Sequence, residues 1–353
     1  MMIPTEPIGS IPRPPALIAA ANQDTAAGPQ LDAMYDAAVR DTICRFEATG
    51  SPVVTDGEQR KYHNFLTYCV HGAPNTSPDG FQIPHTTGNA RMPRLTAAPF
   101  RYQRYADEFL AQALRYASVP VKQAVISPSA LSLMYPPDGI AGYPREAFIT
   151  DLLDEHTTEV RRCLDGGAYR VQIDFTEGHL AMKLDPSGEL LNSFIDLNNL
   201  ALSRFTAAEQ ALIGVHTCPG GERAAAGSTD VDYAELLPSL FELTVGSFYI
   251  ALAGEPDRAR VLDIIARHVR PGQRVFVGVI NTRSERIESP AEVCERVLEA
   301  ARSIPADQLG TTDDCGFAPF CDDQSITRDG AFAKIRARVD GTALASAIIG
   351  GRA

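Results

Sequence analysis

The chain has 353 residues, of which 44% are hydrophobic and 22% charged, and its formal net charge is −12. These proportions indicate a globular protein with ample capacity for a core, built either as one α/β barrel or as two smaller domains. The negative charge argues against nucleic acid or an anionic membrane as a partner, because both would repel the protein. The sequence shows neither a signal peptide nor a membrane span, so we expect a cytoplasmic protein.

Short apolar runs that alternate with helical patterns organise the sequence. Eight of these runs are candidate strands, at residues 3–8, 52–55, 121–126, 169–173, 211–215, 247–252, 275–280 and 308–312. Candidate helices lie at residues 31–47, 145–165, 203–209, 233–243, 256–268, 290–303 and 328–347. Strands that alternate with helices indicate an α/β fold with a parallel sheet, and eight such units predict a single (β/α)8 TIM barrel over residues 1–353.

One segment breaks this alternation. Residues 68–104, between the second and third candidate strands, are rich in proline, glycine, threonine, asparagine and histidine. Their length and composition predict a long insertion loop over the barrel mouth rather than a separate domain.

Polar residues gather directly after the candidate strands. They include Ser10, Glu58, Asp174, Glu177, His216, Cys218, Glu255, Asn281, Asp313, Asp314 and Cys315. The carboxyl ends of the strands form the catalytic face of a barrel, so these residues predict one site at that face.

The residues His216, Cys218 and Cys315 predict a zinc site. His216 and Cys218 are two positions apart at the end of a strand, so their side chains point the same way. Cys315 follows the last candidate strand. Any one of them alone is as readily an ordinary buried side chain. Together they supply one imidazole and two thiolates, a donor set that Zn²⁺ takes in tetrahedral geometry.

This donor set favours sulfur chemistry. Two thiolates and an imidazole make an electron-rich zinc, which suits the binding of a substrate thiol and the lowering of its pKa more than the activation of water. The reaction class that follows is S-alkylation of a small thiol by an alkyl donor. Glu58 and Asp174 could clamp an amine of that thiol, and Ser10 could hold a carboxylate. The plainer alternative is that these acids cap helices or pair with Arg13 or Arg60.

Five motifs resemble a known family in the order in which they occur. They are Ile-Gly-Ser-Ile-Pro-Arg at 8–13, Asp-Gly-Glu at 56–58, Gln-Ile-Asp at 172–174, His-Thr-Cys at 216–218 and Asp-Cys-Gly at 314–316. The resemblance is to the C-terminal catalytic barrel of cobalamin-independent methionine synthase, and it covers nearly the whole chain. It implies a zinc-dependent methyltransferase that methylates homocysteine from a methyltetrahydrofolate-type donor.

The resemblance also implies roles for individual residues. The zinc ligands would be His216, Cys218 and Cys315. The carboxylate of homocysteine would bind at Ile8 and Ser10, and its amino group at Glu58 and Asp174. Glu177 lies near the position associated with the folate, although its spacing after Asp174 differs from the family's.

The sequence departs from the family at two positions. The family's zinc-binding glutamate follows the sixth strand, where Ala251 stands here, so either Glu255 reaches back as fourth ligand or three protein ligands hold the metal. The family's proton-donating histidine follows the seventh strand, where Asn281 stands here. Asparagine is not a general acid, so the proton would come from another donor: His179, Asp313 or Asp314.

Because of these two departures, other functions remain alternatives. The epoxyalkane:coenzyme M transferase is similar in its His-x-Cys pair and distant cysteine, but Glu58 and Asp174 favour an amino-bearing thiol over a sulfonate thiol. A specialised alkyltransferase with a different donor is a third reading. A metal-free decarboxylase of the uroporphyrinogen type is disfavoured by the His/Cys set, and a non-catalytic thiol- or metal-binding barrel is the non-enzyme alternative. The sequence is compatible with a homo-oligomer.

Overall fold

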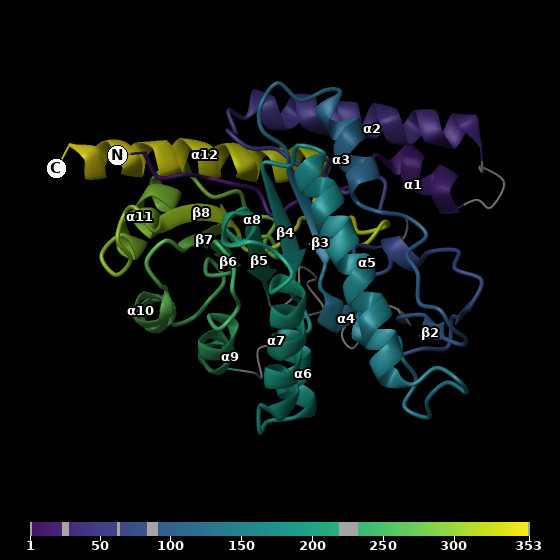
Figure 1. Cartoon of the computed structure of the whole chain (residues 1–353). Coiled ribbons are helices and arrows are strands. Elements are labelled where there is room, and N and C mark those ends of the chain that lie inside the picture. The colour runs from purple at the N-terminus through teal and green to yellow at the C-terminus, as the bar shows by residue number, and fades with distance from the viewer. Residues whose placement is uncertain (1, 23–27, 62–63, 83–90, 219–231, 352–353) are drawn as a thin grey trace.

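A parallel six-stranded sheet forms the centre of the computed structural model, which describes residues 2–22, 28–61, 64–82, 91–218 and 232–351 (Figure 1). The strands follow one another in sequence order: β3 (Lys122–Ile126), β4 (Arg170–Asp174), β5 (Ile213–Thr217), β6 (Ser247–Ile250), β7 (Arg274–Ile280) and β8 (Leu309–Asp313). All six were predicted, within two residues at each end. Ile126 is in register with Asp174, and Asp174 with His216, so the strand ends lie side by side.

The first two candidate strands form single parallel bridges instead of strands. Thr5 pairs with Thr311 of β8, and Val54 pairs with Val121 just before β3. The prediction of full strands was wrong at residues 3–8 because Pro4 and Pro7 have no N–H to donate to a ladder. The N–H of Ile11 donates to the Gly57 carbonyl at 3.0 Å, so the two bridged segments also contact each other.

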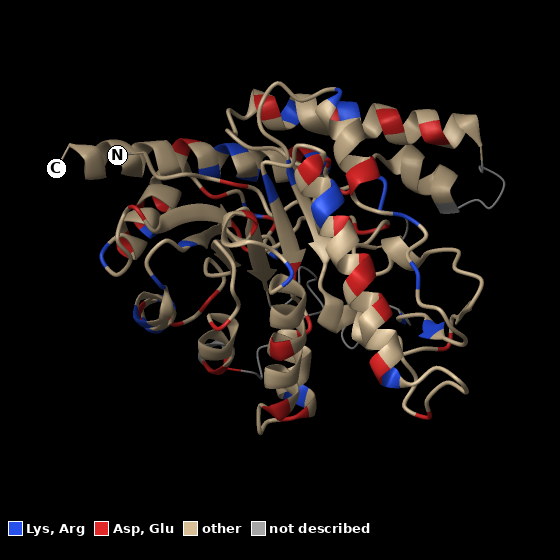
Figure 2. Ribbon diagram, in the orientation of Figure 1, with Lys and Arg blue, Asp and Glu red and all other residues tan. Residues whose placement is uncertain are grey.

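Helices surround the sheet (Figure 1). They are α1 (Pro15–Asn22), α2 (Pro29–Ala48), α3 (Asp107–Leu114), α4 (Pro128–Ser132), α5 (Arg145–Asp165), α6 (Gly178–Leu184), α7 (Glu189–Leu202), α8 (Ala207–Gln210), α9 (Tyr233–Leu240), α10 (Arg258–His268), α11 (Pro290–Ala300) and α12 (Arg328–Gly350). Their starts follow local chemistry: α11 begins at a capping box in which Ser289 accepts from the N–H of Glu292. Among the described residues, no helix is both long and apolar enough to cross a membrane. Acidic and basic residues are both spread over the helices (Figure 2).

The segment 68–104 contains little regular structure. It includes the 3-10 turn η1 (Tyr68–Val70) and the short antiparallel pair β1 (Thr76–Ser77) and β2 (Arg94–Leu95). Leu95 donates its N–H to the carbonyl of Met134, in the turn that follows α4. Its role as a loop over a barrel mouth stays a prediction.

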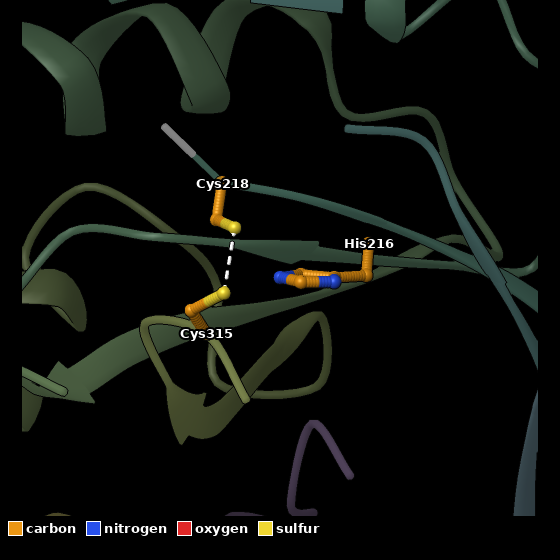
Figure 3. A group of neighbouring side chains, drawn as sticks. All are labelled: His216, Cys218 and Cys315. Carbon is orange, nitrogen blue, oxygen red and sulfur yellow. Dashed lines mark hydrogen bonds between the residues drawn. The ribbon is translucent and has the colours of Figure 1, made fainter. Parts of the chain in front are cut away.

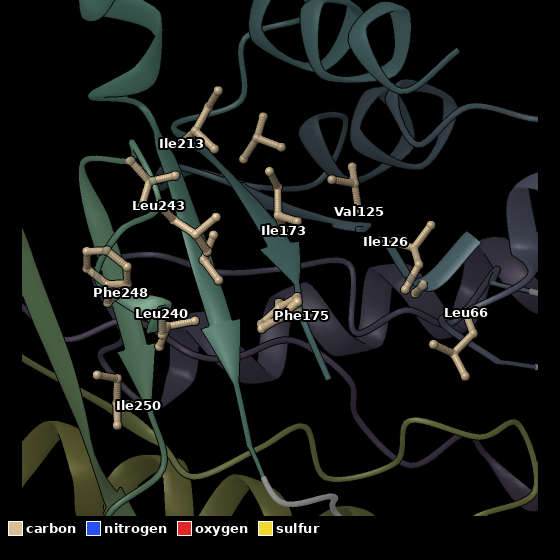
Figure 4. Close-up of a cluster of buried hydrophobic side chains, with 14 of the residues drawn as sticks. Leu66, Val125, Ile126, Ile173, Phe175, Ile213, Leu240, Leu243, Phe248 and Ile250 are labelled. Atoms are coloured by element: carbon tan, nitrogen blue, oxygen red, sulfur yellow. The ribbon is translucent and has the colours of Figure 1, made fainter. Parts of the chain in front are cut away.

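The core lies between the sheet and the helices. Every residue of β3, β4, β5, β6 and β8 is buried, as expected of a parallel sheet covered on both faces. Figure 4 shows part of this core, with Ile173, Ile213 and Phe248 from the strands and Leu243 from the segment before β6.

Charged side chains are also buried against the sheet. The guanidinium of Arg338, from α12, lies 2.5 Å from the Asp313 carboxylate and 2.8 Å from the carbonyl of Glu6, and the Arg338 side chain is fully buried. Lys122 lies 3.8 Å from the centre of the Tyr249 ring, and burial lowers its pKa to about 7. The contacts of Arg338 join α12 to the N-terminal segment and to the end of β8.

Candidate metal centre

The structure brings His216, Cys218 and Cys315 together. His216 lies in β5, Cys218 follows the end of that strand, and Cys315 comes two residues after β8 ends. Their ligand atoms all lie within 4.8 Å of one another, and all three residues are buried (Figure 3). The two sulfur atoms are 2.8 Å apart and share a hydrogen bond, and the two cysteines do not form a disulfide. The predicted convergence of two strand ends on one point is therefore present.

The ring of His216 is oriented by Asp174 on the neighbouring strand. Nδ1 of His216 lies 3.1 Å from Oδ1 of Asp174. The other ring nitrogen, Nε2, has no nitrogen or oxygen partner among the described residues, and one ring nitrogen faces the two sulfurs (Figure 3). Zinc-binding histidines commonly hold a carboxylate on the nitrogen that does not bind the metal. The pair His216–Asp174 has this arrangement.

The electrostatics of the cluster favour a cation. Burial opposes a charge on His216, but Cys218 and Asp174 outweigh it and raise the pKa of His216 to about 10. The hydrogen bond with Cys218, together with burial, raises the pKa of the Cys315 thiol. His216 and Cys315 therefore favour their protonated forms, and binding of a metal ion would release these protons. The imidazole and two thiols, with their orienting carboxylate, fit zinc.

A pocket adjoins the two cysteines. Its lining includes Cys218, Cys315, Ala251, Glu255, Asn281 and Arg283. Ala251 forms a small buried cluster with both cysteines. Glu255 is partly buried, and burial together with the nearby Asp314 carboxylate raises its pKa. Glu255 therefore shares the pocket with the cysteines, while its role as fourth ligand stays a prediction.

Asp314 fixes the loop that carries Ala251. Its Oδ1 accepts hydrogen bonds from the N–H groups of Leu252 at 2.8 Å and Ala253 at 2.7 Å, and its Oδ2 accepts from Gly254 at 2.8 Å. A side chain at Gly278 would meet Oδ1 at 1.9 Å, so glycine is required there. Burial raises the pKa of Asp314 to about 6 despite these hydrogen bonds.

Asp314 lines the pocket, and the role of Asp313, Asp314 or His179 as proton donor stays a prediction. Asp314 is held by three backbone groups, and Asp313 is paired with Arg338 away from the pocket. Burial lowers the pKa of His179, in α6, to about 4, so its ring is neutral at pH 7. Asn281 lines the pocket, and its Oδ1 accepts from the N–H of Arg283 at 3.0 Å.

Ser10 contacts the backbone of the segment that follows Cys315. Its hydroxyl accepts the N–H of Ala318 at 3.1 Å, and its carbonyl accepts the N–H of Phe317 at 2.9 Å. A side chain at Gly316 would meet the Ser10 Oγ at 2.1 Å, so glycine next to Cys315 permits this approach. Ile8, in contrast, is buried against Tyr249 and Phe276 in the interior of the sheet.

Glu58 occupies a tight turn whose geometry depends on Asp56. It is the one residue other than glycine among the described residues with a positive φ, at 57°. Its N–H donates to Oδ1 of Asp56 at 2.9 Å, a turn contact that aspartate commonly makes. Neither of the proposed arginine partners pairs with the Glu58 carboxylate: Arg60 binds Asp32 at 2.6 Å, and Arg13 donates to the backbone carbonyls of residues 58, 59 and 61.

Lys61 is the partner of Glu58, and sequence analysis missed it. Its Nζ lies 3.0 Å from Oε1 of Glu58, and the two side chains are 1% and 9% exposed. Burial opposes the charge on Lys61, but Glu58, Asp174 and Asp56 outweigh it and raise the pKa of Lys61. The sequence signal that could have predicted this ion pair is the spacing of three positions between Glu58 and Lys61.

Glu177 lies in a separate hydrogen-bonded group. Its Oε1 accepts hydrogen bonds from the hydroxyl of Ser127, at 2.6 Å, and from that of Ser129. The side-chain amide of Asn198 donates to the Ser129 hydroxyl oxygen at 2.7 Å. Burial raises the pKa of Glu177 from 4.5 to about 7, against the effect of the two serine hydroxyls. Its folate role stays a prediction.

We expect Glu177→Gln to reduce the pH dependence of stability. Because the folded-state pKa is raised, the stability linked to Glu177 is complete below pH 4.5 and is lost as the pH rises through 7. Between pH 5 and pH 8, the free energy of unfolding should fall by about 2 kcal/mol more in the wild type than in the variant. Urea unfolding at both pH values measures this, with the exposed Glu189→Gln as control. Equal slopes for wild type and Glu177→Gln would contradict the prediction.

Comparison with known proteins places the chain in a family. The model of the cobalamin-independent synthase catalytic domain matches residues 3–328. The chain belongs to this family. The resemblance predicted from the five motifs is thereby confirmed, and membership of the cobalamin-independent synthases supports a methyltransferase.

Relatives within the cobalamin-independent synthase family are distant. An uncharacterized protein of Bacillus subtilis, YxjH, is 25% identical over 318 residues, which cover 82% of this chain and 80% of that protein. The 5-methyltetrahydropteroyltriglutamate–homocysteine methyltransferase of Nitratidesulfovibrio vulgaris is 26% identical over 325 residues. That match covers 89% of this chain and 38% of that protein, so this chain spans well under half the length of that relative.

A solved structure shares the fold. The B12-independent methionine synthase of Shewanella sp. W3-18-1, in complex with selenomethionine, superimposes with a TM-score of 0.79 at 19% identity. The match covers 99% of this chain and all of that one. The α/β fold with its parallel sheet is therefore that of a cobalamin-independent synthase.

Proposed function

We propose that this protein is a zinc-dependent alkyltransferase that methylates, or otherwise alkylates, the sulfur of a small thiol. One observation carries the proposal: His216, Cys218 and Cys315 converge within 4.8 Å, on strand ends separated by 97 positions in the sequence. A structural zinc site is usually closed by four protein ligands, whereas a set of three leaves a position for substrate. When bound, zinc would lower the pKa of a substrate thiol so that the thiolate is present at neutral pH.

The chain's own residues would position the reactants. Asp174 holds the His216 ring in place, and Ser10 lies next to Cys315, where it could bind the anionic end of the thiol. The alkyl donor would enter the pocket lined by Ala251, Glu255 and Asn281. In the reaction, the thiol loses its proton, a sulfur–carbon bond forms, and the bond from that carbon to the donor's leaving atom breaks. The leaving atom then takes up a proton.

The identity of the alkyl donor is less well defined by the site residues than that of the thiol. A methyltetrahydrofolate-type donor is the family's, while Ala251 and Asn281 stand where the family has a zinc glutamate and an acidic histidine. Opening of an epoxide by the same thiolate is therefore the second candidate, because it also forms a thioether and needs a proton only at the product oxygen. A protein that binds thiol or metal without turnover is the third.

We also propose that the eight segments close into a (β/α)8 barrel with one catalytic domain over residues 1–353. The bridges at Thr5 and Val54 extend both edges of the six-stranded sheet, and the hydrogen bond from Ile11 to Gly57 joins the two extensions, which supports closure. Residues 68–104 would then lie at the barrel mouth.

Metal analysis combined with thiol-dependent turnover tests the function. Purified protein should contain about one zinc per chain, as a single three-residue site allows. It should form a thioether from homocysteine or another small thiol in the presence of a methylfolate or an epoxide. Removal of the metal by a chelator should stop turnover, and added zinc should restore it. A protein that forms product equally well without metal would refute the proposal.

A further inference from the structure

We propose that Cys218 and Cys315 form a redox switch: oxidation joins their thiols in a disulfide that excludes the metal ion, and reduction restores the metal site. The oxidant is a small peroxide, and the reductant is a low-molecular-weight thiol. This inference goes beyond the proposed function, because it requires neither the thiol substrate nor the alkyl donor. It shares with that function only the assignment of the two cysteines as metal ligands.

The two thiols are already in contact. Their sulfur atoms lie 2.8 Å apart, although the residues are 97 positions apart in the sequence. A disulfide has a sulfur–sulfur bond of about 2.05 Å, so the two sulfurs need to approach by less than about 1 Å. Rotation of the cysteine side chains can supply a shift of this size. The five other cysteines are not part of the cluster.

The backbone that carries Cys315 is held on both sides. Before it, the Asp314 carboxylate accepts hydrogen bonds from three backbone N–H groups of the loop after β6. After it, the N–H of Phe317 donates to the Ser10 carbonyl at 2.9 Å, and the N–H of Ala318 donates to the Ser10 hydroxyl at 3.1 Å. These contacts fix the position from which the Cys315 side chain extends.

The sheet holds the backbone just before Cys218. Thr217, the last residue of β5, is in register with Ile250, the last residue of β6. The fold therefore keeps the Cys218 thiol beside the Cys315 thiol. Groups that are held together in this way react as if each were present at a very high concentration around the other.

A pocket open to solvent reaches both thiols. Its lining includes Cys218 and Cys315, and its volume is about 90 Å³. A water molecule needs roughly 10–15 Å³ by the same measure, so a molecule the size of hydrogen peroxide fits. The two cysteines themselves are only 2% and 6% exposed. Access through a pocket of this size favours a small oxidant over a bulky one.

Peroxide chemistry can close the disulfide in two balanced steps. Hydrogen peroxide first oxidises one thiol to a sulfenic acid and is reduced to water and the sulfenic hydroxyl. The second thiol then attacks the sulfenic sulfur, a sulfur–sulfur bond forms, and the hydroxyl leaves with a proton as a second water. Two electrons pass from the cysteines to the peroxide. A small thiol reverses the change by exchange through a mixed disulfide and is itself oxidised to a disulfide.

The disulfide and the metal exclude each other. The thiolate is the form of cysteine that binds a metal, so the disulfide would leave His216 as the only ligand of the three. Conversely, a bound metal ion protects the thiols, because only metal-free molecules can form the disulfide. With free zinc at about ten times its Kd, about one molecule in eleven is metal-free, so disulfide formation should slow about tenfold.

Peptide mapping after peroxide treatment tests the inference. Wild-type full-length protein is treated with hydrogen peroxide, with and without added zinc, and digested without reductant. We expect a peptide pair cross-linked through Cys218 and Cys315, formed about tenfold more slowly with free zinc at about ten times its Kd. The oxidised protein should take up no zinc until dithiothreitol is added, as measured with a chromogenic chelator. Absence of this cross-link would overturn the inference.

Two variants and the zinc measurement separate the possible outcomes. Cys163→Ser, which alters a buried thiol outside the cluster, should still form the cross-link, and Cys315→Ser should not. If Cys315→Ser fails to fold, the peptide maps of the wild type and Cys163→Ser still decide. A cross-link that leaves zinc uptake unchanged would overturn this inference alone. A fully reduced protein that binds no zinc would refute the proposed function as well.

Discussion

Replacing Cys218 with serine should remove zinc and abolish thiol alkylation. A serine hydroxyl is a far weaker zinc ligand than a thiolate, and the site has only His216 and Cys315 besides. Changes to residues that merely orient zinc ligands already cost about 10- to 100-fold in metal affinity, so loss of a ligand should cost more than about 100-fold. Zinc content after dialysis and the rate of thioether formation measure the two effects.

Cys163→Ser is the matched control for this change. Cys163 is a fully buried free thiol in α5, and it is not part of the cluster. Both variants place a hydroxyl where a buried thiol stood, but only Cys218→Ser alters the metal centre. Cys163→Ser should keep its zinc. A Cys218→Ser protein that retained stoichiometric zinc and wild-type turnover would contradict the assignment of this site.

Replacing Arg338 with methionine should lower the free energy of unfolding by about 3–5 kcal/mol, because it leaves the Asp313 carboxylate without its partner. Asp313 is 1% exposed, and Arg338 is its ion-pair partner at 2.5 Å. Burial already raises the pKa of Asp313, and Arg338 opposes that shift. Urea denaturation monitored by circular dichroism gives the difference.

Two further variants separate the ion pair from other effects. Arg336→Met removes an exposed arginine two residues earlier in α12 and should change stability by less than about 1 kcal/mol. Asp313→Leu, added to Arg338→Met, should restore part of the loss, because the uncompensated buried charge is gone. If Arg338→Met were no less stable than Arg336→Met, the buried pair would not have the proposed importance.

The sheet and the metal cluster could be predicted from the sequence because both follow from short-range patterns. Buried parallel strands are rich in apolar residues, and six of the predicted apolar runs form the six strands of the sheet. His216 and Cys218 share a side of β5 through the two-residue period of a strand. Cys315 could be added because the ends of parallel strands meet at one edge of the sheet.

The details of the site could not be predicted, because they depend on tertiary contacts. Two candidate strands became single bridges. Prolines interrupt the first, and only Val54 of the second forms a bridge, to Val121 just before β3. The partner of Glu58 depends on a turn with positive φ, which no strand or helix period describes. The sequence suggested Asp314 as a proton donor. In the structure its carboxylate accepts hydrogen bonds from three backbone N–H groups of the loop after β6, and the absence of a side chain at Gly278 leaves room for it.

The separation of the two halves of the metal cluster also sets the order of events during synthesis. Cys218 and Cys315 are 97 positions apart in the sequence, and strands β6, β7 and β8 lie between them. A ribosome must therefore synthesise β6, β7 and β8 before the second thiol can reach the first. Metal uptake would then follow assembly of the last strand, and the ion would stabilise only molecules whose sheet is already complete.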